Sequence, residues 1–109
     1  MGIICAVMLA MAGSGEASDI IDTNKIKALE IKGDIEFGEY LASECTACHK
    51  ASSGDNKIPV IAGRSVNDFI IALYSYKLKS RRSQVMEMVA DRLSDEEIAA
   101  LAAYFSSLK

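Results

Sequence analysis

The run Cys45-Thr46-Ala47-Cys48-His49 lies near the middle of this 109-residue chain and contains its only histidine. Two intervening residues place the two sulfurs beside two attachment points on one flat ring, and the imidazole follows at once. Cys-x-x-Cys-His is the attachment pattern of c-type haem. We therefore expect one covalently bound haem c, with thioethers from Cys45 and Cys48 and with His49 as a ligand of the iron. A cofactor held in this way adds apolar bulk and a cross-link, which help a chain this short to fold stably.

The same residues allow three other interpretations. A thioredoxin-like redox pair also uses Cys-x-x-Cys, but it needs a βαβ context that the sequence does not predict. A structural zinc site needs four ligands, and beyond the first 17 residues the chain offers only Cys45, Cys48 and His49 as cysteine or histidine ligands. In an oxidising compartment the two cysteines are also able to form a plain disulfide. The helical pattern and the export signal described below favour haem over all three.

Length and composition limit the class of protein. The chain is long enough for one domain and is half hydrophobic, so it can build one small core. Its 12 basic and 15 acidic residues give a net charge of −3, which argues against nucleic acid as a partner because phosphate binding needs a clustered basic excess. The absence of Trp, with only three Phe and one Pro, is typical of a compact helical protein.

The first 17 residues have the pattern of a signal peptide. Residues 2–12 are almost entirely apolar and lead into the small residues Ala12-Gly13-Ser14-Gly15 and then Ala17. This is an h-region before a signal-peptidase site, and it is too short to span a bilayer. No Lys or Arg precedes the apolar run, so a start further upstream or an uncleaved anchor stays open. We expect residues 1–17 to be removed on export to the periplasm, with no stable membrane insertion of the mature chain.

Beyond this leader, residues 18–33 form a lead-in segment with room for a short helical turn, and residues 34–109 form the predicted domain. The pattern of the domain is helical. A helix begins at Asp34, with an apolar stripe that is made up of Ile35, Phe37, Tyr40, Leu41 and Cys45. Residues 51–56 have the composition of a loop, and the extended piece Ile58-Pro59-Val60-Ile61 is closed by Gly63.

Three further helices are predicted in the second half of the chain. One begins between Ser65 and Asn67 and ends in a basic cluster that consists of Lys77, Lys79, Arg81 and Arg82. A short helix spans residues 85–90. The last begins at the capping box Ser94-Asp95-Glu96-Glu97, and its apolar face consists of Ile98, Leu101, Ala102, Phe105 and Leu108. No stretch predicts a strand, so the fold class is all-α.

The sixth ligand of the iron must come from elsewhere in the chain. No second histidine exists, and the methionines that remain after removal of the leader are Met86 and Met88. A thioether is neutral and soft and favours ferrous iron, which suits an electron carrier. Residues two apart on a helical turn point to different faces, so only one of the two can reach the iron. Ordinary filling of the core is the alternative role for either methionine.

Three motifs follow one another in the order and spacing of a known family. They are Cys45 to His49, Ile58-Pro59-x-Ile61-Ala62-Gly63, and Met86-x-x-Val89-Ala90-x-x-Leu93-Ser94-Asp95-Glu96-Glu97-Ile98. With them the chain resembles the class I cytochromes c over residues 34–109. The resemblance implies the class I cytochrome c fold, in which an N-terminal helix containing Gly38 packs across a C-terminal helix containing Leu101 and Tyr104. It also implies that Met86 is the distal ligand and that the carbonyl of Pro59 binds the other nitrogen of His49, which would fix the imidazole.

A narrower similarity concerns the pattern Phe69-x-x-x-Leu73-x-x-Tyr76-Lys77-x-x-x-Arg81-x-x-x-x-Met86. It is similar to the cytochrome subunits of flavocytochrome c sulfide dehydrogenases and to short cytochromes of the c553 and c4 types, which usually carry Gly where this chain has Lys79. By this resemblance Arg81 would neutralise a haem propionate. For Lys77, Lys79 and Arg82, a solvated basic face and a docking patch for an acidic partner both stay open.

These observations predict a periplasmic monohaem cytochrome c that carries single electrons in a respiratory or sulfur-oxidation chain and is not itself an enzyme. Its partners would be redox proteins, such as a flavoprotein dehydrogenase or a terminal oxidase or reductase. One alternative is the haem c subunit of a flavocytochrome c complex, which accepts electrons from a flavoprotein. The other is a haem with an open sixth site, in a sensor or a peroxidase-like protein.

Overall fold

The computed structural model describes residues 22–50 and 58–108, and in these residues the chain forms helices and connecting segments without a strand. The predicted all-α class is confirmed. The predicted leader over residues 1–17 and the loop over residues 51–56 lie outside the described residues. The described elements are the 3₁₀ turns η2 (Thr23–Lys25) and η3 (Lys27–Glu30) and the helices α1 (Ile35–Leu41), α2 (Ser43–Thr46), α3 (Val66–Lys77), α4 (Gln84–Arg92) and α5 (Asp95–Ser107).

Polar caps set the starts of the longer helices. A helix leaves its first amide groups without partners inside the helix, and a side-chain oxygen just before it can accept from them. The Ser65 hydroxyl does this for α3 and the Ser83 hydroxyl for α4. At α5 the capping box predicted from the sequence is present, because Ser94 Oγ accepts from the Glu97 amide at 3.1 Å and Glu97 Oε1 accepts from the Ser94 amide at 2.8 Å. These local bonds explain why the predicted starts are correct.

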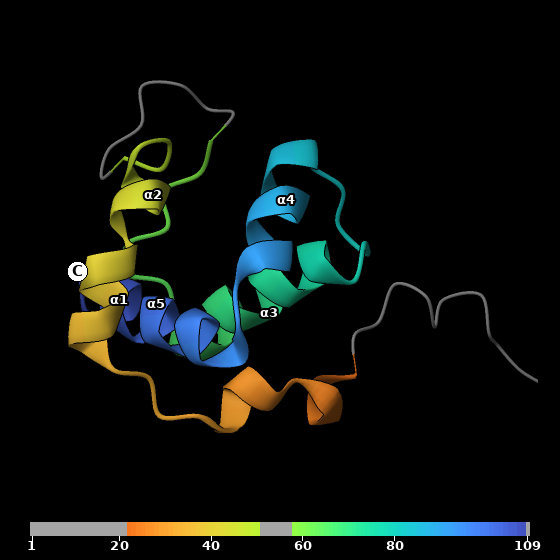
Figure 1. Ribbon diagram of the computed structural model, residues 1–109, viewed down its shortest axis with the longest axis horizontal. Coiled ribbons are helices and arrows are strands. Elements are labelled where there is room, and N and C mark those ends of the chain that lie inside the picture. The colour runs from red at the N-terminus through yellow and green to blue at the C-terminus, as the bar shows by residue number, and fades with distance from the viewer. Residues whose placement is uncertain (1–21, 51–57, 109) are drawn as a thin grey trace, which may run out of the picture.

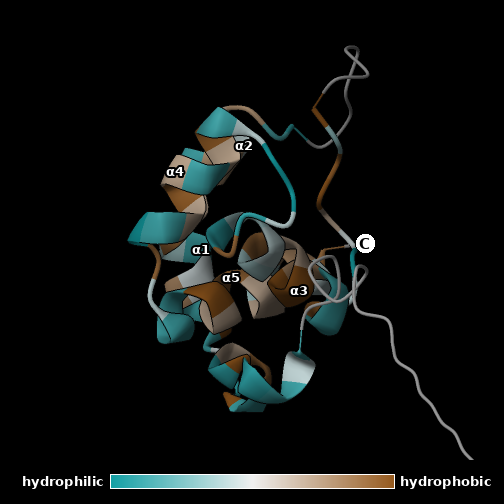
Figure 2. Cartoon of the chain, turned by 90° about the vertical axis from the view of Figure 1, so that its right-hand side faces the viewer, coloured by the Kyte–Doolittle hydropathy of each residue, from teal (hydrophilic) through white to brown (hydrophobic). Residues whose placement is uncertain are grey.

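The hydrophobic core lies between α3 and α5. The rings of Phe69 and Phe105 are stacked with their centroids 5.5 Å apart, and Figure 2 shows hydrophobic residues concentrated where the two helices meet. The segment before α1 also contributes to this core. Ile26 and Ala28, which are isolated apolar positions in the lead-in sequence, are both buried. The other residues of the cluster include Ile70, Leu73, Ala90, Ile98, Leu101 and Ala102.

Helix α1 crosses α5 at close range, and a glycine makes this possible. A Cβ atom built on Gly38 would overlap the carbonyl oxygen of Ala100 and lie 2.8 Å from Tyr104 Cβ. The predicted packing of the Gly38 helix across the C-terminal helix is therefore confirmed. The apolar stripe predicted for this helix is buried only in part, because Leu41 and Cys45 pack against the core cluster and the other three residues do not. Ile35, Phe37 and Tyr40 are exposed, because α1 approaches α5 through the small residue Gly38 instead.

The remaining helices stand on one side of the α3–α5 pair. In Figure 1, α1 and α2 rise at one end and α4 rises at the other, and the C-terminal end of α5 lies beside α1. This arrangement carries the Cys45–His49 motif, at the end of α2, and the two methionines, on α4, to the same side of the core. Among the described helices, none has the length and apolar character needed to cross a membrane.

Candidate functional site

The two thiols and the imidazole lie on a single tight turn. The Cys45 amide donates to Ala42 O at 2.9 Å, and the amides of Cys48 and His49 both donate to Cys45 O, at 3.1 and 2.7 Å. The chain thus continues to wind beyond the last residue of α2, so three candidate ligands follow one another within one turn. Cys45 is half-buried, Cys48 is exposed, and both thiols are free.

The environment of Cys45 does not suit a redox-active thiol. Burial, with a smaller contribution from the carboxylate of Glu44, raises the pKa of the Cys45 thiol to about 11. A reactive cysteine pair requires a lowered thiol pKa, because the thiolate is the nucleophile. The raised pKa of the Cys45 thiol therefore weighs against the thioredoxin-like interpretation. In residues 22–50 and 58–108, no three His, Cys, Asp or Glu side chains come together as a metal site.

The imidazole of His49 is held by the backbone of a distant segment. Its Nδ1 lies 2.8 Å from the carbonyl oxygen of Pro59, which is the contact that the family resemblance implied. A carbonyl only accepts hydrogen bonds, so Nδ1 carries the proton and Nε2 is left with its lone pair for a metal. The segment that bears Pro59 is itself fixed, because the amide of Gly63 (φ 83°) donates to Phe105 O of α5 at 2.8 Å.

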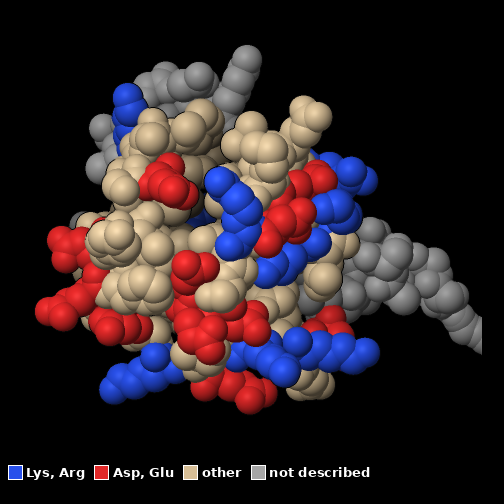
Figure 3. All heavy atoms as spheres, in the orientation of Figure 1, with Lys and Arg blue, Asp and Glu red and all other residues tan. Residues whose placement is uncertain are grey.

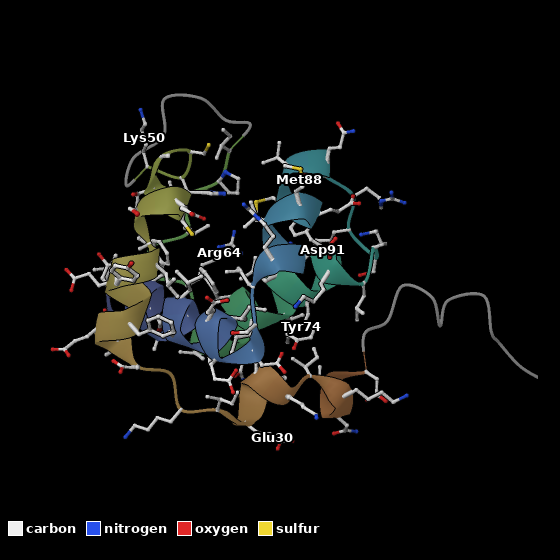
Figure 4. All side chains as sticks on the ribbon, in the orientation of Figure 1. Glu30, Lys50, Arg64, Tyr74, Met88 and Asp91 are labelled. Carbon is white, nitrogen blue, oxygen red and sulfur yellow. The ribbon has the colours of Figure 1, made fainter. Side chains whose placement is uncertain are left out.

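The two methionines of α4 occupy different environments. Met86 is half-buried and packs against the core cluster. Met88, labelled in Figure 4, is 62 % exposed. The amide of Met86 donates to the cap oxygen Ser83 Oγ at 3.3 Å, so its backbone belongs to the fixed first turn of the helix. Of the two thioethers, that of Met86 is on the side of the protein interior.

Most of the predicted basic cluster is engaged within the protein. Lys77 Nζ donates to Leu93 O at 2.7 Å and lies over the ring of Tyr74. Lys79 forms ion pairs with Glu87 and Asp91, and Arg82 forms one with Glu87. Figure 3 accordingly shows acidic side chains among the basic ones at the upper right of the view, where α4 lies in Figure 1. The cluster is therefore not a free basic patch, and this weakens its interpretation as a docking site for an acidic partner.

Two arginines, Arg81 and Arg64, have no carboxylate partner among the described residues. Arg81 is exposed, with its guanidinium 6.0 Å from the centre of the Tyr76 ring. Arg64 was not singled out in the sequence analysis, and Figure 4 places it between α2 and α4. The signal that could have found it is a basic residue directly after the Gly63 turn. Either cation is able to balance the carboxylate of a bound group.

The donor set fits a c-type haem. It consists of two free thiols on one turn, an imidazole whose Nδ1 is already bonded, and a half-buried thioether on another helix. Imidazole and thioether are both established haem-iron ligands, and the exposed or half-buried thiols are available for covalent attachment. The described residues therefore provide each kind of group that the sequence motif predicts.

Comparisons with known proteins agree with this site. A family model described as "Cytochrome c" matches residues 35–109. The chain is similar to the cytochrome subunit of sulfide dehydrogenase from Chlorobaculum tepidum, with 38 % identity over 72 residues that cover 65 % of this chain and 66 % of that protein. It is 33 % identical to cytochrome c4 of Pseudomonas aeruginosa over 71 % of this chain and 39 % of that protein. It is also 33 % identical to cytochrome c-554(548) of Halomonas halodenitrificans, over 69 % and 96 % of the two chains.

Proposed function

The chain belongs to the cytochrome c family, whose members transfer electrons on covalently attached haem, and on that premise we propose that it is a one-electron carrier with its iron between His49 and Met86. The observation that carries this assignment is the bond from His49 Nδ1 to Pro59 O, because it leaves Nε2 for the metal. The half-buried position of Met86 supports the choice of the distal ligand. The role of the protein is electron transfer and not catalysis.

Cys45 and Cys48 would hold the haem covalently. Each S–H group would add across one C=C bond of the group, with the sulfur on one carbon and the hydrogen on the other, so that no external oxidant would be consumed. This addition requires both thiols to be reduced, and both are free in the structure. Because the two residues lie on one tight turn with His49, attachment also fixes where the imidazole meets the iron.

The protein's own groups would tune and protect the redox centre. When bound, the haem supplies a one-electron ferrous–ferric couple. The Pro59 carbonyl keeps the His49 ring in one tautomer and orientation. A neutral thioether from Met86 favours the ferrous state and so raises the potential. Arg81, and with it Arg64, would balance the haem carboxylates, which supports binding without placing a further ligand on the iron.

The optical spectrum of the purified holoprotein tests this assignment. With His49 and Met86 both on the iron, the oxidised protein should show a methionine–iron charge-transfer band, and the reduced protein a sharp c-type spectrum that carbon monoxide leaves unchanged. Ready binding of carbon monoxide to wild-type protein would instead favour the open-site alternative, because a closed His/Met pair leaves no coordination position.

We also propose that the protein is exported to the periplasm and loses residues 1–17. The apolar run before Ala17 supports this, and haem attachment through free thiols is compatible with an exported chain. The intact mass of the denatured protein is expected to equal residues 18–109 plus one haem. A mass that includes residues 1–17 would contradict removal of the leader, and a mass without haem would contradict covalent attachment.

A second candidate is the haem subunit of a dehydrogenase complex. It is favoured by the similarity to a protein named as the cytochrome subunit of sulfide dehydrogenase. In that case the electron donor would be a flavoprotein, bound stably and not only on encounter. Size-exclusion chromatography of the native material separates the two cases: co-elution with a flavin-containing protein supports the subunit, and elution as a lone small haem protein supports the free carrier in a respiratory or sulfur-oxidation chain.

A further inference from the structure

The turn between α3 and α4 contains an unusual backbone conformation. After the last residue of α3, Lys79 has a φ of 67°, in the left-handed region that favours glycine. The amide of Ser80 donates to Ser75 O at 2.9 Å and that of Lys79 to Tyr76 O at 3.2 Å. These two bonds are those of a Schellman motif, in which the left-handed position is usually Gly. Lysine at this position strains the backbone, which glycine would not do. We therefore expect the Lys79 side chain to make stabilising contacts that offset this cost.

The side chain of Lys79 lies between two carboxylates of α4. Its Nζ is 3.7 Å from Glu87 Oε1 and 3.6 Å from Asp91 Oδ2. Glu87 and Asp91 are four residues apart on the helix, where like charges repel each other. A cation placed between them removes that repulsion and at the same time ties the end of α3 to the first two turns of α4.

Glu87 is the central member of this network. Its Oε2 accepts from the Ser83 amide at 2.9 Å and from Arg82 Nε at 3.1 Å, while its Oε1 faces Lys79. The side chain of Glu87 is only 15 % exposed, whereas its partners Lys79 and Arg82 are 48 % and 73 % exposed, so each ion pair is of modest strength. Glu87 directly follows Met86, and the network therefore acts on the turn that carries the proposed distal ligand.

We propose that Lys79 is a positioning residue, which clamps α4 through Glu87 and Asp91 and so keeps Met86 on the iron. The inference rests on the proposed function, since it takes Met86 to be the ligand. Lys79 itself does not touch the cofactor in this arrangement. Its effect is on how readily the segment with Met86 moves away and gives up the sixth coordination position.

Displacement of the methionine by imidazole measures this effect in the oxidised holoprotein. The form of imidazole that binds iron is neutral, so at a fixed pH above its pKa its binding depends little on the net charge of the protein. In Lys79→Gln the clamp is lost, and the apparent affinity for imidazole is expected to rise about threefold, as the loss of modest ion pairs implies. Lys79→Arg keeps the cation and should restore wild-type affinity. Lys32→Gln removes one exposed positive charge outside the network and serves as the matched control, with no expected change.

Lys79→Gly separates the clamp from general stability. It relieves the left-handed strain, so its melting temperature should equal or exceed that of Lys79→Gln, yet its affinity for imidazole should rise as in Lys79→Gln. Unchanged imidazole affinity in both variants would overturn the clamp, as would equal effects in Lys32→Gln. Failure of the proposed function is distinguishable, because wild-type protein would then lack the methionine–iron band before any variant is made.

Discussion

Replacement of Met86 by alanine is expected to open the sixth coordination position of the iron. The methionine–iron band of the oxidised protein should disappear, and the reduced protein should bind carbon monoxide. The reduction potential should fall by on the order of 0.1 V or more, because axial ligands set haem potentials over a range of about 0.8 V and a thioether favours the ferrous state. Optical spectra with and without carbon monoxide, together with a redox titration, provide the measurements.

Met88→Ala is the matched control for this prediction. Met88 lies on the same helix and has the same side chain, but it is 62 % exposed. Its replacement should leave the band, the response to carbon monoxide and the potential as in the wild type. If Met86→Ala kept the band and Met88→Ala lost it, the distal ligand would be Met88, and α4 would have to rotate relative to the structure described above.

Gly38→Ala is expected to cause a large loss of stability. The added Cβ would overlap the carbonyl oxygen of Ala100 and lie 2.8 Å from Tyr104 Cβ. Because the first of these contacts is with backbone, a side-chain rotation cannot relieve it, and α1 must move away from α5. Overpacking of a core costs about 1–3 kcal/mol and sometimes more. At the upper end of that range, the melting temperature of a domain of this size falls by roughly 10 to 20 °C, which thermal unfolding followed by circular dichroism would measure.

The control for Gly38→Ala is Glu39→Ala on the same helix. Glu39 is exposed, and its replacement by alanine should change the free energy of unfolding by no more than about 0.5 kcal/mol. Equal melting temperatures for Gly38→Ala and Glu39→Ala would show that α1 does not approach α5 as closely as described. A selective loss in Gly38→Ala would support the helix crossing on which the position of the Cys45–His49 turn depends.

Local features of the sequence are sufficient to predict where the helices begin and where the haem attachment motif lies. The start of α5 follows from Ser94 and Glu97, whose reciprocal bonds involve residues three apart. The Cys45–His49 turn likewise needs only five consecutive residues. Such signals depend on short-range geometry, which the sequence alone specifies, and for that reason the predicted fold class and the predicted helix starts agree with the structure, the starts to within about one residue. The helix ends agree less well, since the helix that was predicted to begin at Asp34 is divided into α1 and α2 and α4 continues to Arg92.

The burial of the apolar residues and the ion pairing of the basic residues depend on packing partners that lie far away in the sequence. The predicted apolar stripe is buried only in part: Leu41 packs against the core, whereas Tyr40 is 78 % exposed, since Gly38 makes the close contact with α5. Likewise, composition suggested an open basic surface around Lys79. The structure places two carboxylates of the next helix beside it.

The sequence by itself therefore determined the chemistry of this protein: two thiols and an imidazole in the spacing of a haem attachment motif, two candidate methionines and an all-helical chain. The tertiary structure decided which groups are brought together. It places Pro59 O against the His49 ring, packs Met86 against the core while Met88 stays exposed, and places the Lys79 ammonium beside Glu87 and Asp91. The physical reason is that capping and motif spacing act over a few residues, whereas burial and ion pairing depend on how whole helices pack.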